Sequence, residues 1–116
     1  MKRYDGKNKK FNVFAYGELM KEERLKELIN RVPKMKKGKI FGFEKFFDES
    51  IGYYGIKRKE GSTVEGVILM DITEEELRIF DDYEDEGIYY FREKTKAIDE
   101  EGNEYDVYVY LRVKEE

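Results

Sequence analysis

The sequence predicts an α+β fold built around a small mixed β-barrel or a curled sheet. About six segments have the length and pattern of β-strands, whereas only two segments show a helical period. No internal repeat and no linker interrupts these segments. Because 116 residues is close to the usual size of one domain, residues 1–116 are expected to form a single domain.

The first two predicted elements are a strand and a helix. Residues 11–16 (FNVFAY) form an apolar, aromatic run typical of a largely buried strand, and Gly17 ends it. The helix that follows has an apolar stripe with the spacing i, i+3, i+4 and i+7: Leu25, Leu28, Ile29 and Val32. Pro33 is expected to end this helix.

The middle of the chain predicts three more strands. Residues 35–47 alternate as a strand that can bend at a glycine. Residues 51–56 (IGYYGI) and 64–70 (VEGVILM) form two further strands, and the charged segment 57–62 between them is expected to be a turn.

The second helix has the clearest local signature in the sequence. Thr73 is the expected N-cap, and Glu76 three residues later completes a capping box. The helix should therefore run from about Glu74 to about Glu84.

The last part of the chain predicts a β-hairpin. Residues 88–98 and 104–113 form its strands, and residues 99–103 (DEEGN) form its turn. In the final strand the valines and Leu111 alternate with Tyr108, Tyr110 and Arg112, so the two sets face opposite sides.

Composition narrows the chemistry available to the chain. His, Cys, Gln and Trp are absent, so a Ser-His-Asp triad, a thiol nucleophile and the usual zinc sites are excluded. Any general base must be Asp, Glu, Lys or Tyr. The net charge of −4 disfavours nucleic-acid binding. We expect a cytoplasmic protein, because the sequence has no secretory signal and no apolar run long enough to span a membrane.

The abundance of charged residues suggests a thermophilic protein. Lys and Glu are numerous and thermolabile residues are few, which is a pattern of hyperthermophile proteins. A melting temperature in the ordinary mesophile range would contradict this expectation.

Glu84 is the strongest candidate catalytic residue. At about 100° per residue, Glu84 falls about 20° from Leu77 and about 40° from Phe80, within the apolar stripe of the second helix. A carboxylate in that position is either paired or desolvated, and a desolvated carboxylate suits a general base near neutral pH. Glu84 also belongs to a dense acidic run over 81–86, which could instead be a solvated helix end. The run could also bind Mg²⁺ or Ca²⁺, although it lacks the EF-hand spacing.

A second candidate feature is the turn Tyr16-Gly17-Glu18-Leu19, between the first strand and the first helix. Gly17 allows a tight bend and a close approach of a ligand to the backbone. Free backbone N–H groups at a helix start favour an anion or an oxyanion. By itself this turn is weak evidence, because strand–glycine–helix turns are common and mostly structural.

Taken together, these motifs resemble the γ-glutamylcyclotransferase-like family, also called AIG2-like. The resemblance rests on the Tyr-Gly-x-Leu turn at 16–19, the strand and capping segment 66–73, the segment 77–84 (LRIFDDYE), Tyr90-x-Arg92 and the late segment 107–109. These motifs occur in the family's order over nearly the whole chain.

The resemblance implies a small β-barrel flanked by helices and an enzyme that releases 5-oxoproline from a γ-glutamyl amine or peptide. Glu84 would be the general acid and base, and Tyr16, Gly17, Glu18 and Leu19 would bind the substrate. Tyr108 is a further candidate for lining the pocket. The implied reaction uses no metal and no organic cofactor.

Two positions depart from the family pattern. Glu18 stands where the family usually has a small or polar residue, so its carboxylate could repel a substrate carboxylate, point outward or favour a cationic group. Asp85 follows Glu84 where a glycine is common. A register that uses Glu86 instead is rejected, because Asp81 and Tyr83 fit only the first register and Glu86 lies about 200° from Glu84 on the helix.

Other functions remain open on the sequence alone. A catalytically silent binding or interaction domain on the same fold is the main alternative, and Glu18 is the feature that favours it. A metal-binding protein built on residues 81–86 is a third. Arg92 is expected to pair with the acidic run as a structural contact. The γ-glutamyl compound itself (a glutathione degradation product, a γ-glutamyl-lysine crosslink or a polyamine adduct) and the oligomeric state are not determined.

Overall fold

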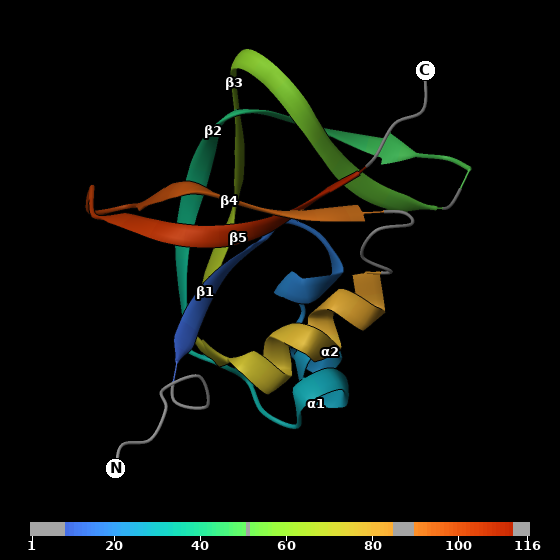
Figure 1. Cartoon of the computed structure of the whole chain (residues 1–116). Coiled ribbons are helices and arrows are strands. Elements are labelled where there is room, and N and C mark those ends of the chain that lie inside the picture. The colour runs from blue at the N-terminus through green and yellow to red at the C-terminus, as the bar shows by residue number, and fades with distance from the viewer. Residues whose placement is uncertain (1–8, 51, 85–89, 113–116) are drawn as a thin grey trace.

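A computed structural model describes residues 9–50, 52–84 and 90–112. Within these ranges the chain forms five strands, two α-helices and a single-turn 3-10 helix, which confirms the α+β class (Figure 1). In chain order the elements are β1 (Lys10–Ala15), η2 (Glu18–Met20), α1 (Glu22–Ile29), β2 (Met35–Asp48), β3 (Tyr53–Thr73), α2 (Glu74–Glu84), β4 (Tyr90–Asp99) and β5 (Glu104–Arg112).

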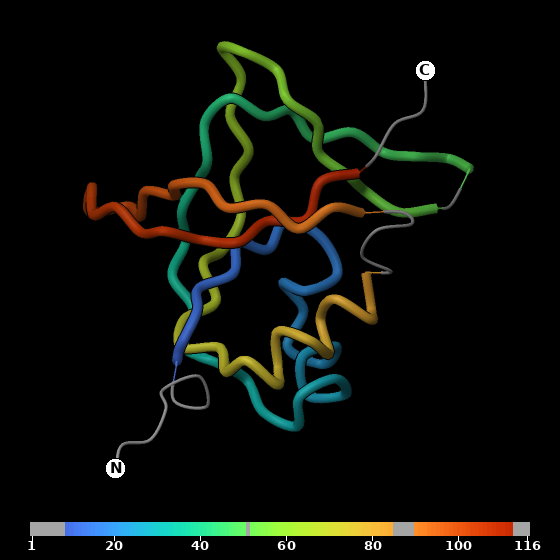
Figure 2. Tube along the Cα trace, viewed as in Figure 1, coloured from blue at the N-terminus to red at the C-terminus, as the bar shows by residue number. Residues whose placement is uncertain are grey.

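The five strands close into the expected small mixed barrel. The order around the barrel is β1-β3-β2-β4-β5, with antiparallel pairing between each of these neighbours. Closure comes from a parallel contact between β1 and β5 at Val13 and Tyr108. The helices α1 and α2 pack against each other at one end of the barrel, and the segment after β1 passes beside them (Figures 1 and 2).

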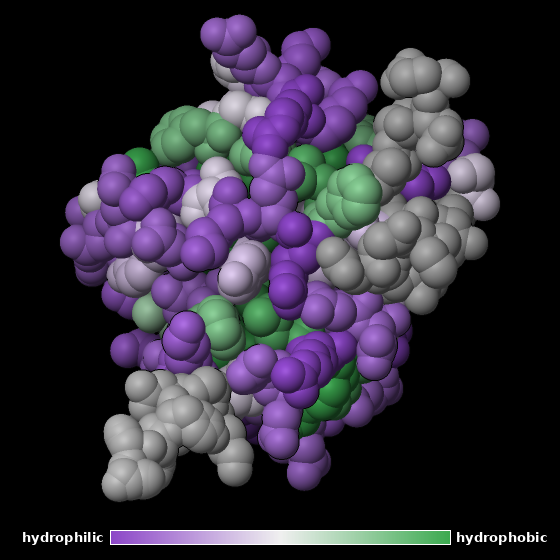
Figure 3. All heavy atoms as spheres, in the orientation of Figure 1, coloured by the Kyte–Doolittle hydropathy of each residue, from purple (hydrophilic) through white to green (hydrophobic). Residues whose placement is uncertain are grey.

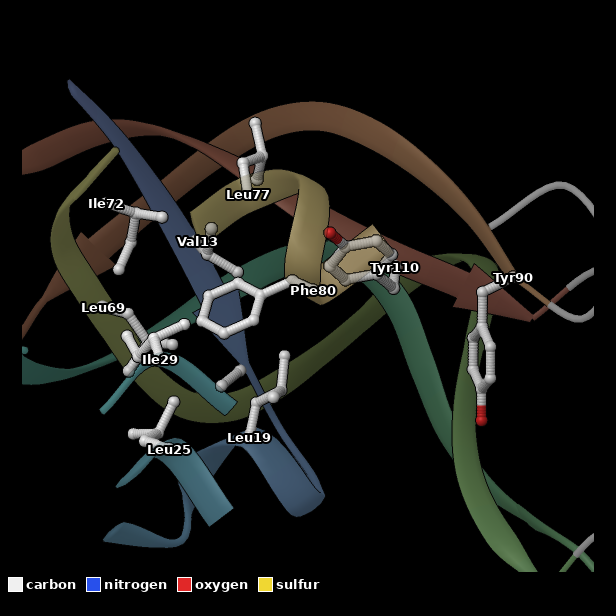
Figure 4. Close-up of a cluster of buried hydrophobic side chains, with 11 residues drawn as sticks. Val13, Leu19, Leu25, Ile29, Leu69, Ile72, Leu77, Phe80, Tyr90 and Tyr110 are labelled. Atoms are coloured by element: carbon white, nitrogen blue, oxygen red, sulfur yellow. The ribbon is translucent and has the colours of Figure 1, made fainter. Parts of the chain in front are cut away.

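Two apolar clusters hold this arrangement together. One fills the barrel and includes the fully buried Phe43, Ile56 and Ile68. The other joins the helices to the barrel, and Figure 4 shows the Phe80 ring of α2 at its centre, between Val13 of β1 and side chains of α1. Burying the second cluster fixes α2, and therefore the position of its last residue, against the barrel.

On the face shown in Figure 3, hydrophilic side chains predominate, with small apolar patches between them. This agrees with the high charged fraction of the sequence, 43%. None of the helices in the described ranges has the length and apolar character that crossing a membrane requires.

The expected turn at residues 57–62 is not present. β3 continues through this segment, and only its register against β2 shifts: Phe41 pairs with Thr63, but Phe43 pairs with Arg58. Several β3 residues therefore stand opposite the single residue Gly42, whose φ of 85° is a conformation that glycine adopts easily. The charged, glycine-containing segment marks an irregularity in pairing and not a chain reversal.

Helix α1 ends earlier than the apolar stripe suggests. Its last residue is Ile29, and Asn30 adopts a left-handed conformation (φ 63°) while its N–H bonds to the carbonyl of Lys26. This is a common way to terminate a helix. Val32, predicted as the last position of the stripe, therefore lies outside the helix.

The capping box of α2 is formed as the sequence predicts. The backbone N–H of Glu76 donates to Thr73 Oγ1, and the backbone N–H of Thr73 donates to Glu76 Oε1, each at 3.1 Å. Arg31 donates to both carboxylate oxygens of Glu76, at 2.7 Å each. These hydrogen bonds hold the pKa of Glu76 below its usual range and tie the start of α2 to the segment after α1.

The β4–β5 turn is organised by the carboxylate of Asp99. One oxygen accepts hydrogen bonds from the backbone N–H groups of Glu101 and Asn103, and the other accepts from the hydroxyl of Tyr105, each at 2.9 Å. Burial alone would raise the pKa of Asp99, but the bonds from Asn103 and Tyr105 outweigh it and hold this pKa at about 2.

Asp99→Asn is expected to lower the melting temperature in a pH-dependent way. Because the folded pKa is below the ordinary value near 4, the ionised carboxylate stabilises the fold above that pH and loses this effect as the pH falls toward 2. Melting curves of both proteins between these limits should show a gap that closes in acid. Glu100→Gln, an exposed change in the same turn, should show no such gap. A constant gap across the range would contradict the prediction.

Candidate active site

A pocket of about 660 Å³ opens where the segment after β1, the end of α2 and the β2–β3 hairpin meet. This volume is in the range of small-molecule sites. Eight of the 17 described residues that line it are aromatic, and the charged ones are Glu18, Glu84, Lys21 and Lys45. The other lining residues are Phe14, Ala15, Tyr16, Gly17, Leu19, Met20, Phe47, Gly52, Tyr53, Tyr54, Tyr83, Tyr90 and Tyr110.

The turn predicted as a binding element lies in the pocket wall. All of Tyr16, Gly17, Glu18 and Leu19 line the pocket. Leu19 and Tyr16 are also anchored in the interior, at 3% and 7% exposure. A Cβ atom built on Gly17 would meet no atom within 4 Å outside its chain neighbours, so no packing contact excludes a side chain here. The absence of a side chain leaves this part of the backbone accessible.

Glu84 is the last residue of α2, is half-buried and lines the same pocket as this turn. Leu77 and Phe80 are buried on the same helix, at 4% and 0% exposure, as the helical phase predicts. The apolar face of α2 therefore carries the carboxylate into the pocket at the point where the helix leaves the core.

Tyrosines surround Glu84. Burial, followed by the nearby charge of Glu84, raises the pKa of Tyr90 to about 12 and that of Tyr16 well above its usual value. Burial and the bond to Asp81 do the same for Tyr110. The Tyr16 hydroxyl donates to the carbonyl of Tyr110 at 2.5 Å, and the Tyr90 hydroxyl donates to the carbonyl of Tyr54 at 3.1 Å. With their pKa values raised, these phenols are neutral near pH 7 and do not act as bases. The Tyr16 and Tyr90 hydroxyls already donate hydrogen bonds to backbone carbonyls.

Glu18 does not face the pocket as an unpaired charge. Its carboxylate contacts Lys21 Nζ at 2.9 Å and an Arg24 guanidinium nitrogen at 3.4 Å. The hydrogen bond from Lys21, more than any other contact, lowers the pKa of Glu18. Glu18 is therefore a poor proton acceptor, and its negative charge is largely balanced.

A hydrogen-bonded network fixes α2 one turn before Glu84. The two carboxylate oxygens of Asp81 accept from the hydroxyl of Tyr110 at 2.6 Å and from Arg92 at 2.7 Å. The expected pairing of Arg92 with the acidic run is thus confirmed. Because Tyr110 and Arg92 come from β5 and β4, the network ties the helix to the barrel beside the pocket.

Tyr108, a predicted pocket residue, is not among the lining residues. Its ring packs 5.8 Å from the Phe11 ring, and the Arg92 guanidinium lies 4.7 Å from its centroid. Tyr110, on the same face of β5 and one pleat further along, lines the pocket instead. Alternation predicts the face of a strand, but it does not predict which residue of that face reaches the site.

Sequence reasoning missed the contribution of the β2–β3 hairpin. Lys45, Phe47, Tyr53 and Tyr54 all line the pocket, although they are far in sequence from both predicted site segments. In the structure Phe47, Tyr53 and Tyr54 are between 49% and 51% exposed. Exposed aromatic side chains that lie together indicate a binding surface, and this signal is not visible in the sequence.

The described parts of the chain show no arrangement of side chains that supports the metal-binding alternative. There, no group of three carboxylates is arranged to hold a metal ion. Asp81 is engaged by Tyr110 and Arg92. Asp85 and Glu86, which complete the acidic run and include the alternative glutamate, lie outside the described residues.

Comparison with known proteins assigns this chain to a family. The model of the family "Gamma-glutamyl cyclotransferase, AIG2-like" matches residues 13–116. The chain belongs to this family, as the resemblance in its motifs implies.

Curated relatives agree with this assignment. A protein of Methanocaldococcus jannaschii, named as a gamma-glutamylcyclotransferase and candidate RNase, is 69% identical over 91% of this chain and 48% of its own length. The AIG2-like protein D of Arabidopsis thaliana is 31% identical over 75% of this chain and 56% of its own length. The chain thus spans about half the length of the curated relatives it matches.

Solved structures share the fold. A solution structure of an Arabidopsis thaliana protein superposes with a TM-score of 0.81 at 27% identity, covering 90% of this chain and 69% of that one. A structure named gamma-glutamyl cyclotransferase also gives 0.81, at 22% identity, covering 93% and 69%.

Proposed function

We propose that this chain is a γ-glutamylcyclotransferase that releases 5-oxoproline from a γ-glutamyl amine or peptide, with Glu84 as general acid and base. The observation that carries the proposal is the half-buried carboxylate of Glu84 in a pocket rich in aromatic residues, which the turn 16–19 also lines. Family membership and the name of the Methanocaldococcus jannaschii relative support it.

Glu84 is the group that we propose as proton acceptor among the described lining residues, since the other candidates are less suited to that role. Tyr16, Tyr90 and Tyr110 have raised pKa values, and Glu18 has a lowered one because it is paired with Lys21. A γ-glutamyl α-ammonium placed between Glu84 and the surrounding tyrosine rings would meet a carboxylate and aromatic faces, both favourable for a cation.

The reaction begins when the Glu84 carboxylate takes a proton from the α-ammonium of the substrate. The freed amine attacks the γ-carbonyl carbon, which closes a five-membered ring and places a negative charge on the carbonyl oxygen. Backbone N–H groups of Glu18 and Leu19 would stabilise this oxyanion or anchor the substrate carboxylate. The ring closure is intramolecular, so the substrate itself supplies proximity.

The second half of the reaction breaks the bond from the γ-carbon to the leaving nitrogen. Glu84 returns its proton to that nitrogen. It then takes a second proton from the ring nitrogen and transfers this proton to the leaving nitrogen as well. Two protons thus move from the ring nitrogen to the leaving amine, and Glu84 ends as it began. The products are 5-oxoproline and a free amine.

The test is an assay for 5-oxoproline with purified protein and a panel of γ-glutamyl amino acids, amines and peptides. The proposal predicts 5-oxoproline and the free amine in equal amounts from at least one member. If calorimetry detects binding of panel members but none is turned over, the chain is a binding domain on this fold and the proposal is wrong.

A further inference from the structure

The pocket has a buried part and an exposed part. Tyr16, Tyr90 and Tyr110, which lie near Glu84, are 7%, 7% and 2% exposed. The outer wall, which we define as Lys45, Phe47, Tyr53 and Tyr54, belongs to the β2–β3 hairpin, and its three aromatic residues are about half exposed. If the glutamyl group is bound beside Glu84, the group joined to its γ-amide must extend toward this outer wall.

Side chains of the outer wall contact one another and form a continuous surface. Phe47 and Tyr54 are paired in register across the hairpin, and their rings meet edge to face at 5.1 Å between centroids. Lys45, two residues before Phe47, holds its ammonium 4.6 Å from the centre of the Tyr54 ring. The backbone carbonyl of Tyr54 accepts from the Tyr90 hydroxyl, which joins the outer wall to the buried part.

Lys45 differs from the other lysine of the pocket. Lys21 contacts the Glu18 carboxylate at 2.9 Å. For Lys45, no carboxylate of the described residues lies within ion-pair distance, and its observed contact is with the Tyr54 ring. The ammonium is therefore held at the mouth of the pocket with the capacity to pair with an anion from the substrate.

We propose that the outer wall is the leaving-group subsite, and that it selects leaving amines that carry a carboxylate beside a flat apolar group. The inference rests on the proposed function and adds the substrate class to it. Phe47, Tyr53 and Tyr54 supply apolar area for a ring or a broad side chain. Lys45 pairs with the carboxylate and opposes a cationic leaving group, because its own ammonium already occupies the Tyr54 face.

The experiment compares three substrates that share the γ-glutamyl group: γ-glutamyl-phenylalanine, γ-glutamyl-phenethylamine, which lacks the leaving-group carboxylate, and γ-glutamyl-cadaverine, which carries a cation. Release of 5-oxoproline gives kcat/KM for each. The wild type is expected to prefer the first to the second by about tenfold or more, since hydrogen bonds to charged groups are worth this much, and to use the third least.

Lys45→Gln should remove most of that preference by lowering kcat/KM for γ-glutamyl-phenylalanine alone. Lys57→Gln is the matched control: Lys57 lies on the opposing strand of the same hairpin, 5.6 Å over the Phe46 ring, and does not line the pocket. This control should retain the wild-type preference. A melting curve for each variant checks that both fold as the wild type does.

The outcomes separate the two proposals. Absence of 5-oxoproline from every substrate would overturn the proposed function and the subsite with it. Turnover without a preference for the carboxylate in the wild type would overturn the subsite alone. So would an equal loss on all three substrates in Lys45→Gln, since Lys45 would then contact the glutamyl group that they share.

Discussion

Glu84→Gln is expected to reduce 5-oxoproline release by at least about 100-fold, because a positioned general acid and base contributes at this level or more. The amide keeps the shape of the side chain but can neither accept the ammonium proton nor return it to the leaving amine. The loss should appear in kcat more than in KM, since the contacts that bind the glutamyl group remain. Initial rates on the best substrate of the panel measure it.

Asp82→Asn is the matched control for this change. Asp82 lies on the same helix but is exposed and does not line the pocket. It removes one negative charge at nearly the same distance along α2, so it separates the role of Glu84 from a general effect of charge. Retained activity in Glu84→Gln would show that another group carries the protons.

Gly66→Ala is expected to produce the largest loss of stability among single-methyl changes. A Cβ atom at this position would lie 2.2 Å from the carbonyl oxygen of Ala15 and 2.9 Å from the Phe14 ring. β1 and β3 pair here, with Ala15 opposite Val67, so the backbone has to move. Overpacking of this kind costs about 1–3 kcal/mol in the free energy of unfolding.

The same change should also reduce activity, because Ala15 directly precedes the turn that begins at Tyr16. Denaturant unfolding measures the stability, and 5-oxoproline release at a temperature where the variant is folded measures the activity. Glu65→Ala alters an exposed neighbour on the same strand and should leave both near the wild-type level. Equal stability of Gly66→Ala and the wild type would contradict the close approach of the strands.

Local sequence signals predicted those parts of the fold that local interactions determine. The reciprocal bonds of Thr73 and Glu76 are made within one turn, and the predicted helix 74–84 matches α2. The same phase places Glu84 beside the buried face. The continuity of β3 was not predicted, because its pairing with β2 across the irregular segment is a long-range property.

The pocket could be predicted only in part, because some of its residues are brought together by long-range strand pairing. The turn 16–19 and Glu84 have signatures in their own segments, and the structure brings them together. The outer wall depends on how far the β2–β3 hairpin extends past the other strands, which no local pattern determines. Tyr108 and Tyr110 share one face of β5, and only the register of the closed barrel decides that Tyr110 reaches the pocket.

The most direct test of the central claim is a crystal structure of Glu84→Gln with a γ-glutamyl substrate bound. The proposal predicts that the substrate α-nitrogen lies about 3 Å from the side chain at position 84, within hydrogen-bond reach. The γ-carbonyl should face the backbone of Glu18 and Leu19. A substrate bound elsewhere, or bound here with its α-nitrogen away from position 84 and toward the outer wall, would contradict the account.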